Sequence, residues 1–153
     1  KSATYTETSA KTNPLWRVKA DAAFPCATQN EILAEDAKQL VKNGVRLVAE
    51  GANMPTHPDA IEVFQAAKVL YAPGKAANAG GVATSGLEMA QNSHRQTWSR
   101  DVVDQELRKI MHNIHSNCAR TAAEYDAPGD YVFGANVSGF TRVARAMLEQ
   151  GVV

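Results

Sequence analysis

Asparagine side chains recur in short segments that each follow an apolar run of the chain. The segments are PCATQN (25–30), EGANMP (50–55) and APGKAANAGG (72–81), with Asn30, Asn53 and Asn78. Amide side chains donate and accept hydrogen bonds, which suits a carboxamide or a ribose, and small neighbours let a flat ring approach the backbone. These residues form a ligand site if the fold brings the segments to one place.

The apolar runs indicate the elements that would position these segments. Buried strands are predicted at about 20–25, at 45–50 and at 69–72, with helices over 30–44 and 58–68 between them. This alternation predicts an open parallel sheet with right-handed crossovers. Because like-directed strands end at the same edge, where ligands of open α/β sheets bind, we expect the asparagine segments to share that edge.

The remainder of the chain is predicted to be helical. One helix covers 81–96, a second is capped by Ser99, and a third ends at Gly151. An apolar stripe at three- and four-residue steps marks the second helix, from Val103 to Tyr125. The predicted fold class is therefore α/β, a Rossmann-type half-domain with parallel strands followed by C-terminal helices.

The glycine-rich segment also predicts a helix start that could hold an anion. Asn78 is expected to cap this helix, while Gly80 and Gly81 leave N–H groups of the first turn uncovered. Ser85 lies one turn further on the same face, which suits a carboxylate. Neither G-x-x-x-x-G-K-[ST] nor G-x-G-x-x-G occurs in the chain. Taken alone, Ser85 is more commonly a helical serine bonded back to a carbonyl, and Asn53 is more commonly a turn residue.

Composition excludes several classes of function. Lys plus Arg and Asp plus Glu balance at 16 each, so no basic field is available for nucleic acid. No apolar run approaches the roughly 18–20 residues that cross a bilayer, so we expect no membrane partner. The two cysteines, Cys26 and Cys118, are too few for a disulfide framework and predict a reducing, cytoplasmic setting. Cys26 is expected to be a small buried residue.

A metal site at His112, His115 and Cys118 is the one candidate that helical spacing offers. No fourth ligand is apparent, and Cys118 belongs to the apolar stripe. We therefore expect no metal, and solvated or interface histidines instead.

Four stretches together resemble the hexameric glutamate dehydrogenase family, especially its small bacterial and fungal members. They are PCATQNE, VAEGANMPT, APGKAANAGGVATSGLEMAQNS and GANVSGFTRVARAMLEQGV. The resemblance covers residues 14–153, whereas residues 1–13 match poorly. It implies that 14–153 is the C-terminal part of a dinucleotide-binding domain, including the terminal helices. The catalytic lysines and aspartate of the family lie outside this chain, so it contains no catalytic residue and alone should be inactive.

The same resemblance implies roles for individual residues. Ala27 and Thr28 would lie along the cofactor, NADP or NAD with NADP favoured, and Asn53 and Asn78 would contact its nicotinamide end. On the substrate side, Val82 would form a wall of the pocket and Ser85 would bind the distal carboxylate. The implied reaction interconverts glutamate with 2-oxoglutarate and ammonium, in a homohexamer.

Two alternatives remain open from the sequence. One is another amino-acid dehydrogenase, for leucine, phenylalanine or valine, whose pocket would lack a polar partner at Ser85. The other is a non-catalytic module that binds a nucleotide or serves in assembly. Because the family's substrate domain lies outside this chain, the resemblance to glutamate dehydrogenases also implies apolar faces that are left exposed here.

Overall fold

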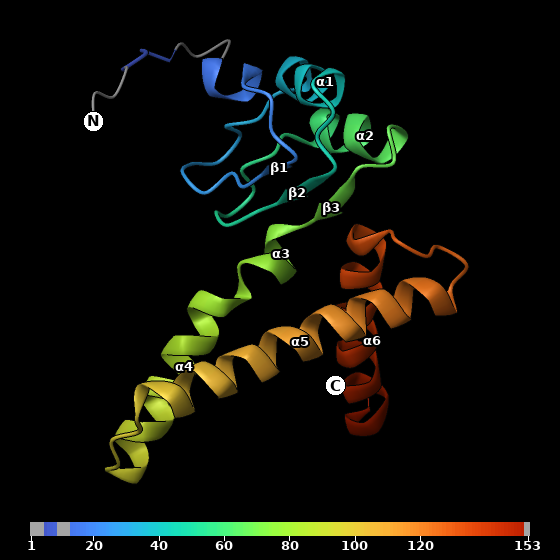
Figure 1. The fold of residues 1–153 in the computed structure, drawn as a ribbon. Coiled ribbons are helices and arrows are strands. Elements are labelled where there is room, and N and C mark those ends of the chain that lie inside the picture. Colours follow the sequence, from blue (N-terminus) through green and yellow to red (C-terminus); the bar gives the residue numbers. More distant parts are fainter. Residues whose placement is uncertain (1–4, 9–12, 152–153) are drawn as a thin grey trace. The chain divides into compact units, whose positions relative to one another are not determined.

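The computed structural model describes residues 5–8 and 13–151. The chain divides into two compact units, Lys1–Gly74 and Lys75–Val153. The first is built from strands and helices and the second from helices alone, as the ribbon shows for the described residues (Figure 1).

The first unit contains a three-stranded parallel sheet in the order β1-β2-β3. Its elements are the 3-10 turn η1 (Pro14–Arg17), β1 (Ala22–Ala23), α1 (Ala34–Lys42), β2 (Leu47–Ala49), α2 (Pro58–Ala66) and β3 (Leu70–Ala72). Leu47 lies opposite Ala22 on one side and Leu70 on the other. The predicted parallel sheet is confirmed, with shorter strands than expected. The first strand stops before Pro25, because proline has no N–H to donate to a ladder.

Helices α1 and α2 lie side by side along the sheet, and the core of the unit forms beneath them (Figure 1). Its largest fully buried side chains include Phe64, Ile32, Leu40 and Val48. The sequence signals at the helix ends are confirmed. Gly44 follows α1 with φ at +86°, a conformation that glycine adopts without steric cost, and Pro58 begins α2.

The helices of the second unit are α3, α4, α5 and α6. Their bounds are Gly74–Ala77, Ala79–His94, Arg100–Glu124 and Tyr131–Gln150, so α3 begins at the last residue of the first unit. Ser99 caps α5 as predicted, its hydroxyl accepting from the Val102 N–H at 3.4 Å. Gly151 follows the last helix. Helix α5 packs against both α4 and α6 (Figure 1).

The predicted capping role of Asn78 is wrong. Its backbone is helical (φ −87°, ψ 0°) and its side chain makes no capping hydrogen bond to α4. The helical course already begins at Gly74, whose N–H donates to the Glu50 carboxylate. Gly81, expected to offer an uncovered N–H, donates to the Asn78 carbonyl at 3.2 Å. A buried carboxylate therefore accepts from the first N–H of α3, a contact that the local sequence does not reveal.

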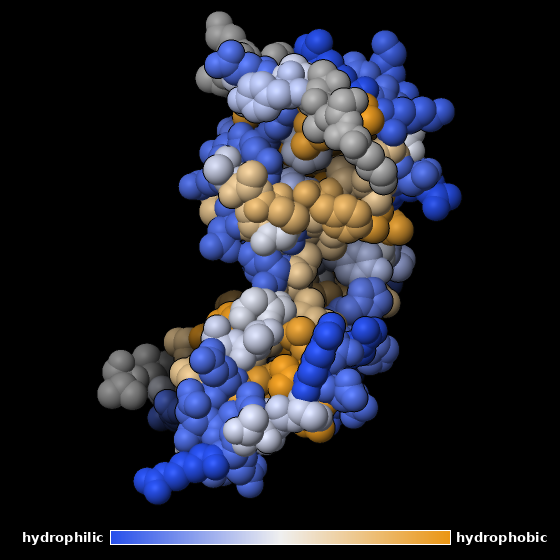
Figure 2. Space-filling model, turned by 60° about the vertical axis from the view of Figure 1, so that its left-hand side comes forward, coloured by the Kyte–Doolittle hydropathy of each residue, from blue (hydrophilic) through white to orange (hydrophobic). Residues whose placement is uncertain are grey.

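Apolar side chains reach the surface of the second unit, as predicted. Figure 2 shows hydrophobic patches among the hydrophilic atoms of the visible face. The large exposed apolar residues of this unit are Val82, Met89, Val102, Tyr125, Phe140, Val143, Met147 and Leu148. Even so, none of the helices within residues 13–151 is long and apolar enough to cross a membrane.

Candidate functional site

Two of the asparagine-bearing loops lie side by side at the carboxyl edge of the sheet. The N–H groups of Gly51 and Ala52 donate to the Pro25 carbonyl at 2.9 and 3.2 Å. The Asn30 N–H donates to the Met54 carbonyl at 2.9 Å. The parallel strands explain this meeting, because β1 and β2 both run toward the same edge. The expectation of a shared edge is confirmed for loops 25–30 and 50–55.

The residues predicted to lie along the cofactor are accessible at this edge. Ala27 and Thr28 are exposed and line a cavity of about 790 Å³ in the first unit. The Ala27 N–H donates to the Glu31 carboxylate at 2.8 Å, which fixes the loop beside the cavity. The Asn53 side chain is exposed in the neighbouring loop. Small side chains and an exposed amide are what a flat, polar ring requires.

The expectation for Cys26 is wrong, because its side chain is exposed. Pro25 is fully buried instead, and successive residues of an extended segment point to opposite sides. The Cys26 sulfur lies against the backbone of Gly51, where an added Cβ would overlap it. A larger residue at position 51 would therefore force the Cys26 side chain to shift.

A buried carboxylate beneath these loops was not found by sequence reasoning. Glu50 is 5% exposed and accepts hydrogen bonds from the Thr56 N–H, the Tyr71 hydroxyl and the Gly74 N–H. We call these four residues the Glu50 cluster. The sequence feature that indicates it is a glutamate directly after an apolar strand. A charged side chain buried at such a position needs hydrogen-bond partners.

The Tyr71 hydroxyl of the Glu50 cluster has a raised pKa. Burial raises the pKa of Tyr71 far above its usual value, and the neighbouring Glu50 carboxylate raises it further. The neutral phenol is the favoured form in the folded protein. The resulting stabilisation is complete below about pH 10, where an unfolded tyrosine ionises, and is lost as pH rises above that value.

We therefore expect a late component in an alkaline titration of tyrosinate absorbance. The component should be missing from Tyr71→Phe, and should coincide in the wild type with the loss of native circular dichroism. Tyr125→Phe is the matched control, because Tyr125 is 57% exposed and lies outside the cluster. Loss of the late component from the control instead would contradict the assignment.

The predicted substrate residues lie on helix α4 of the second unit. Val82 is 73% exposed, and Ser85 is exposed three residues further along the same side of the helix. The Ser85 hydroxyl lies 3.5 Å from the Gly81 carbonyl, the back-bonded geometry that was the alternative interpretation. At that length the bond is weak, so the hydroxyl remains able to serve a ligand. Asn78 is partly buried just before α4.

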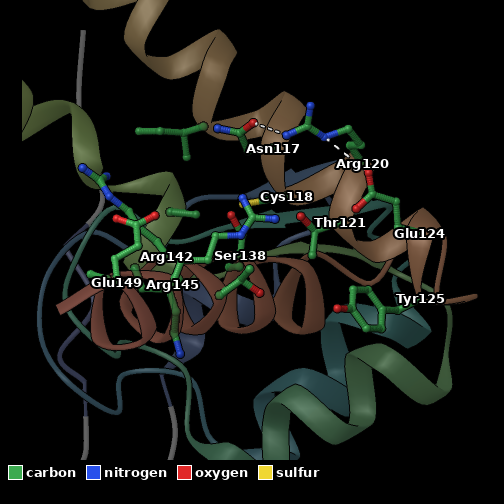
Figure 3. Close-up of a pocket in the computed structure, with 17 residues that line it drawn as sticks. Asn117, Cys118, Arg120, Thr121, Glu124, Tyr125, Ser138, Arg142, Arg145 and Glu149 are labelled. Carbon is green, nitrogen blue, oxygen red and sulfur yellow. Dashed lines mark hydrogen bonds and ion pairs between the residues drawn. The ribbon is translucent and has the colours of Figure 1, made fainter. Parts of the chain in front are cut away.

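The second unit also contains a groove that sequence reasoning missed. It has a volume of about 840 Å³, and Figure 3 shows side chains of α5 and α6 around it. Its cationic residues are Lys75, Arg120, Arg142 and Arg145. The sequence feature that indicates it is the spacing of Arg142 and Arg145, which places both on one side of a helix. The groove is also lined by Glu124 and Glu149, and Arg120 lies 3.7 Å from the Glu124 carboxylate, so its positive charge is partly balanced.

The histidines of α5 take part in local contacts. The ring of His115 lies 5.4 Å from that of Tyr131, with a nitrogen 3.2 Å from the phenol oxygen. Among the described residues, no group of three or more His, Cys, Asp or Glu side chains is placed to hold a metal ion.

A parallel sheet with its helices, and two polar loops at its carboxyl edge, define an α/β half-domain of the Rossmann type. The sequence model of the Glutamate/Leucine/Phenylalanine/Valine dehydrogenase family matches residues 1–151. The chain belongs to this family, as the sequence resemblance indicated.

Individual relatives give the comparison more detail. The chain is 61% identical over 137 residues to an NAD(P)-specific glutamate dehydrogenase of Xylanibacter ruminicola. It is 57% identical over 138 residues to an NADP-specific glutamate dehydrogenase of Escherichia coli. Each alignment covers 90% of this chain and 31% of the relative. The crystal structure of Plasmodium falciparum glutamate dehydrogenase matches with a TM-score of 0.87 and 50% identity, over 90% of this chain and 30% of that one.

Proposed function

We propose that this chain is the nucleotide-binding part of an NAD(P)-dependent glutamate dehydrogenase. The reaction is the reversible conversion of L-glutamate to 2-oxoglutarate and ammonium. The observation that carries the proposal is the meeting of loops 25–30 and 50–55 at the carboxyl edge of a parallel sheet, in a chain of this family. Because the chain spans about 31% of its curated relatives, activity is expected of the complete polypeptide that carries it.

In this proposal the first unit holds the cofactor. Ala27 and Thr28 line its course, and the Asn53 amide meets the nicotinamide end. Asn78, in the second unit, keeps the cofactor role that the family resemblance implies. Exposure of Ala27, Thr28 and Asn53 supports these roles. The bound nicotinamide supplies the hydride chemistry, and the protein contributes binding, orientation and charge complementarity. NADP is favoured over NAD, which agrees with the named specificity of the E. coli relative, and the X. ruminicola relative is named for both.

The substrate roles fall on α4. Val82 forms an apolar wall for the carbon chain, and Ser85 donates its hydroxyl to the distal carboxylate of glutamate or 2-oxoglutarate. A hydroxyl–carboxylate hydrogen bond is short and strong because the acceptor is charged. The exposed positions of both side chains support this assignment. We further propose that the complete protein is a homohexamer and acts in the cytoplasm, where the two free cysteines of this chain would remain reduced.

Replacement of Ser85 tests the proposal. In the complete polypeptide, Ser85→Val should lower kcat/KM for glutamate by about 10- to 100-fold, because a charged group loses its hydrogen-bond donor. Norvaline has the same chain length without the distal carboxylate, so its kcat/KM should change by less than about threefold. Steady-state rates of NAD(P)H formation with each substrate give both values.

Thr84→Val is the matched control. Thr84 precedes Ser85, and its hydroxyl is committed to the Gly80 carbonyl at 2.9 Å. Glutamate use should be nearly unchanged in this variant. Equal losses for glutamate and norvaline in Ser85→Val would instead favour a pocket for an apolar side chain, as in a leucine, phenylalanine or valine dehydrogenase.

A further inference from the structure

The Glu50 cluster joins segments that the proposed cofactor site needs to keep in place. One carboxylate oxygen accepts from the Thr56 N–H, at 3.2 Å, and from the Tyr71 hydroxyl, while the other accepts from the Gly74 N–H. None of the described lysines, arginines or histidines pairs with Glu50. The buried charge is therefore held by neutral donors alone, which is tolerable only while these donors remain in position.

The bond to Thr56 closes the loop that contains Asn53. Glu50 stands at the beginning of this loop and Thr56 at its end, so the carboxylate and the backbone together form a ring around the intervening residues. Within the ring, Met54 has φ at +52°, a left-handed conformation that is unfavourable for a bulky residue. A strained backbone of this kind persists where the surroundings fix it.

The bond to Gly74 ties the same loop to the segment after β3. A Cβ at Gly74 would lie 2.9 Å from the Ala52 carbonyl oxygen and 3.0 Å from the Glu50 carboxylate. Only glycine lets the two segments approach this closely without a shift of the backbone. The Ala52 carbonyl directly precedes Asn53 in the chain. The Glu50 carboxylate thus joins the two ends of the loop that contains Asn53. It also holds this loop against the segment that begins at Gly74.

We propose that Glu50 is a positioning residue of the cofactor site, holding the loop 51–56 in the shape that presents the Asn53 amide to the nicotinamide end. This inference rests on the proposed function. Glu50 itself is buried and acts through Asn53. Its effect should therefore appear in the use of the cofactor and not in the recognition of the substrate carboxylate, which the proposal assigns to Ser85.

Glu50→Gln tests the inference with little change in shape. Two partners of Glu50 are backbone N–H groups that can only donate, so an amide nitrogen must oppose either the Gly74 N–H or the Thr56 N–H. In the complete polypeptide, KM for NAD(P)H should rise by about 10-fold or more, while KM for 2-oxoglutarate should change by less than about threefold. Amide hydrogen exchange at Thr56 and Gly74 should accelerate by about 10-fold or more.

Two variants separate positioning from general effects. Glu62→Gln makes the same chemical change at an exposed glutamate of α2 and should leave both KM values and the exchange rates unchanged. Leu40→Ala truncates a buried side chain of α1 that takes no part in the cluster. Leu40→Ala should destabilise the first unit without altering KM for NAD(P)H. If Glu50 contributes only to stability, Glu50→Gln should likewise lower the stability and leave KM for NAD(P)H unchanged.

The outcomes distinguish this inference from the proposed function. A wild-type polypeptide without glutamate-dependent NAD(P)H turnover would overturn the proposed function and the cofactor role of Glu50 with it. Turnover in the wild type together with an unchanged KM for NAD(P)H in Glu50→Gln would overturn the positioning role alone. Unchanged exchange at Thr56 and Gly74 would show that the carboxylate does not fix the loop, whatever the activity.

Discussion

Truncation of Phe64 to alanine should lower the free energy of unfolding of the first unit by about 3–5 kcal/mol. Phe64 has no exposed surface, so the change removes a full ring from the core between α2 and the sheet. The ring also stacks on Tyr71, with centroids 6.0 Å apart and planes at 18°. Tyr71 donates to Glu50, so the cavity would also loosen the support of the Glu50 cluster. The substitution should therefore affect both the core of the first unit and the Glu50 cluster.

Urea denaturation followed by tryptophan fluorescence measures this loss. Trp16 is buried in the first unit, whereas Trp98 is half-buried in the second, so a Trp98→Phe background isolates the signal of the first unit. Phe24→Ala is the matched control, because Phe24 is 60% exposed. Its effect should stay within about 0.5 kcal/mol. Similar losses at Phe64 and Phe24 would show that α2 does not close the core in the manner described.

The order of the strands and helices could be predicted because the signals for it are local. Apolar runs, Gly44 and Pro58 punctuate the first unit, and strand–helix alternation leaves few topologies other than a parallel sheet. The meeting of the loops at 25–30 and 50–55 then follows from strand direction. The roles of individual residues came from the resemblance to glutamate dehydrogenases. The geometry of the loops alone fits both a ligand site and ordinary turns.

The features that could not be predicted depend on partners distant in sequence. Asn78 has the ideal chemistry for a cap, but a separate short helix, α3, precedes it, and the first N–H of α3 donates to Glu50 across 24 positions of the chain. Cys26 turns outward because Pro25 occupies the interior. In each case a contact made only in the folded chain overrides a local preference.

Gly134→Ala should disrupt the packing of α5 on α6, although alanine is the better helix former. Gly134 is buried on α6, where an added Cβ would overlap the Cys118 carbonyl oxygen of α5 and lie 3.3 Å from the Ala122 Cβ. The obstructing atom belongs to the backbone of a 25-residue helix, so it cannot rotate away as a flexible side chain would. We expect a net loss of about 1–3 kcal/mol, as in other overpacked cores.

Gly139→Ala makes the same substitution on the same helix and should have the opposite sign. Nothing lies within 4 Å of a Cβ at Gly139, so the variant gains helix propensity without a clash. A stabilisation of up to about 1 kcal/mol is expected. Amide hydrogen exchange around Cys118 reports the opening of α5 in both variants. Because the two changes are chemically identical, a difference in sign can come only from the approach of α5 to Gly134, and equal effects would refute that approach.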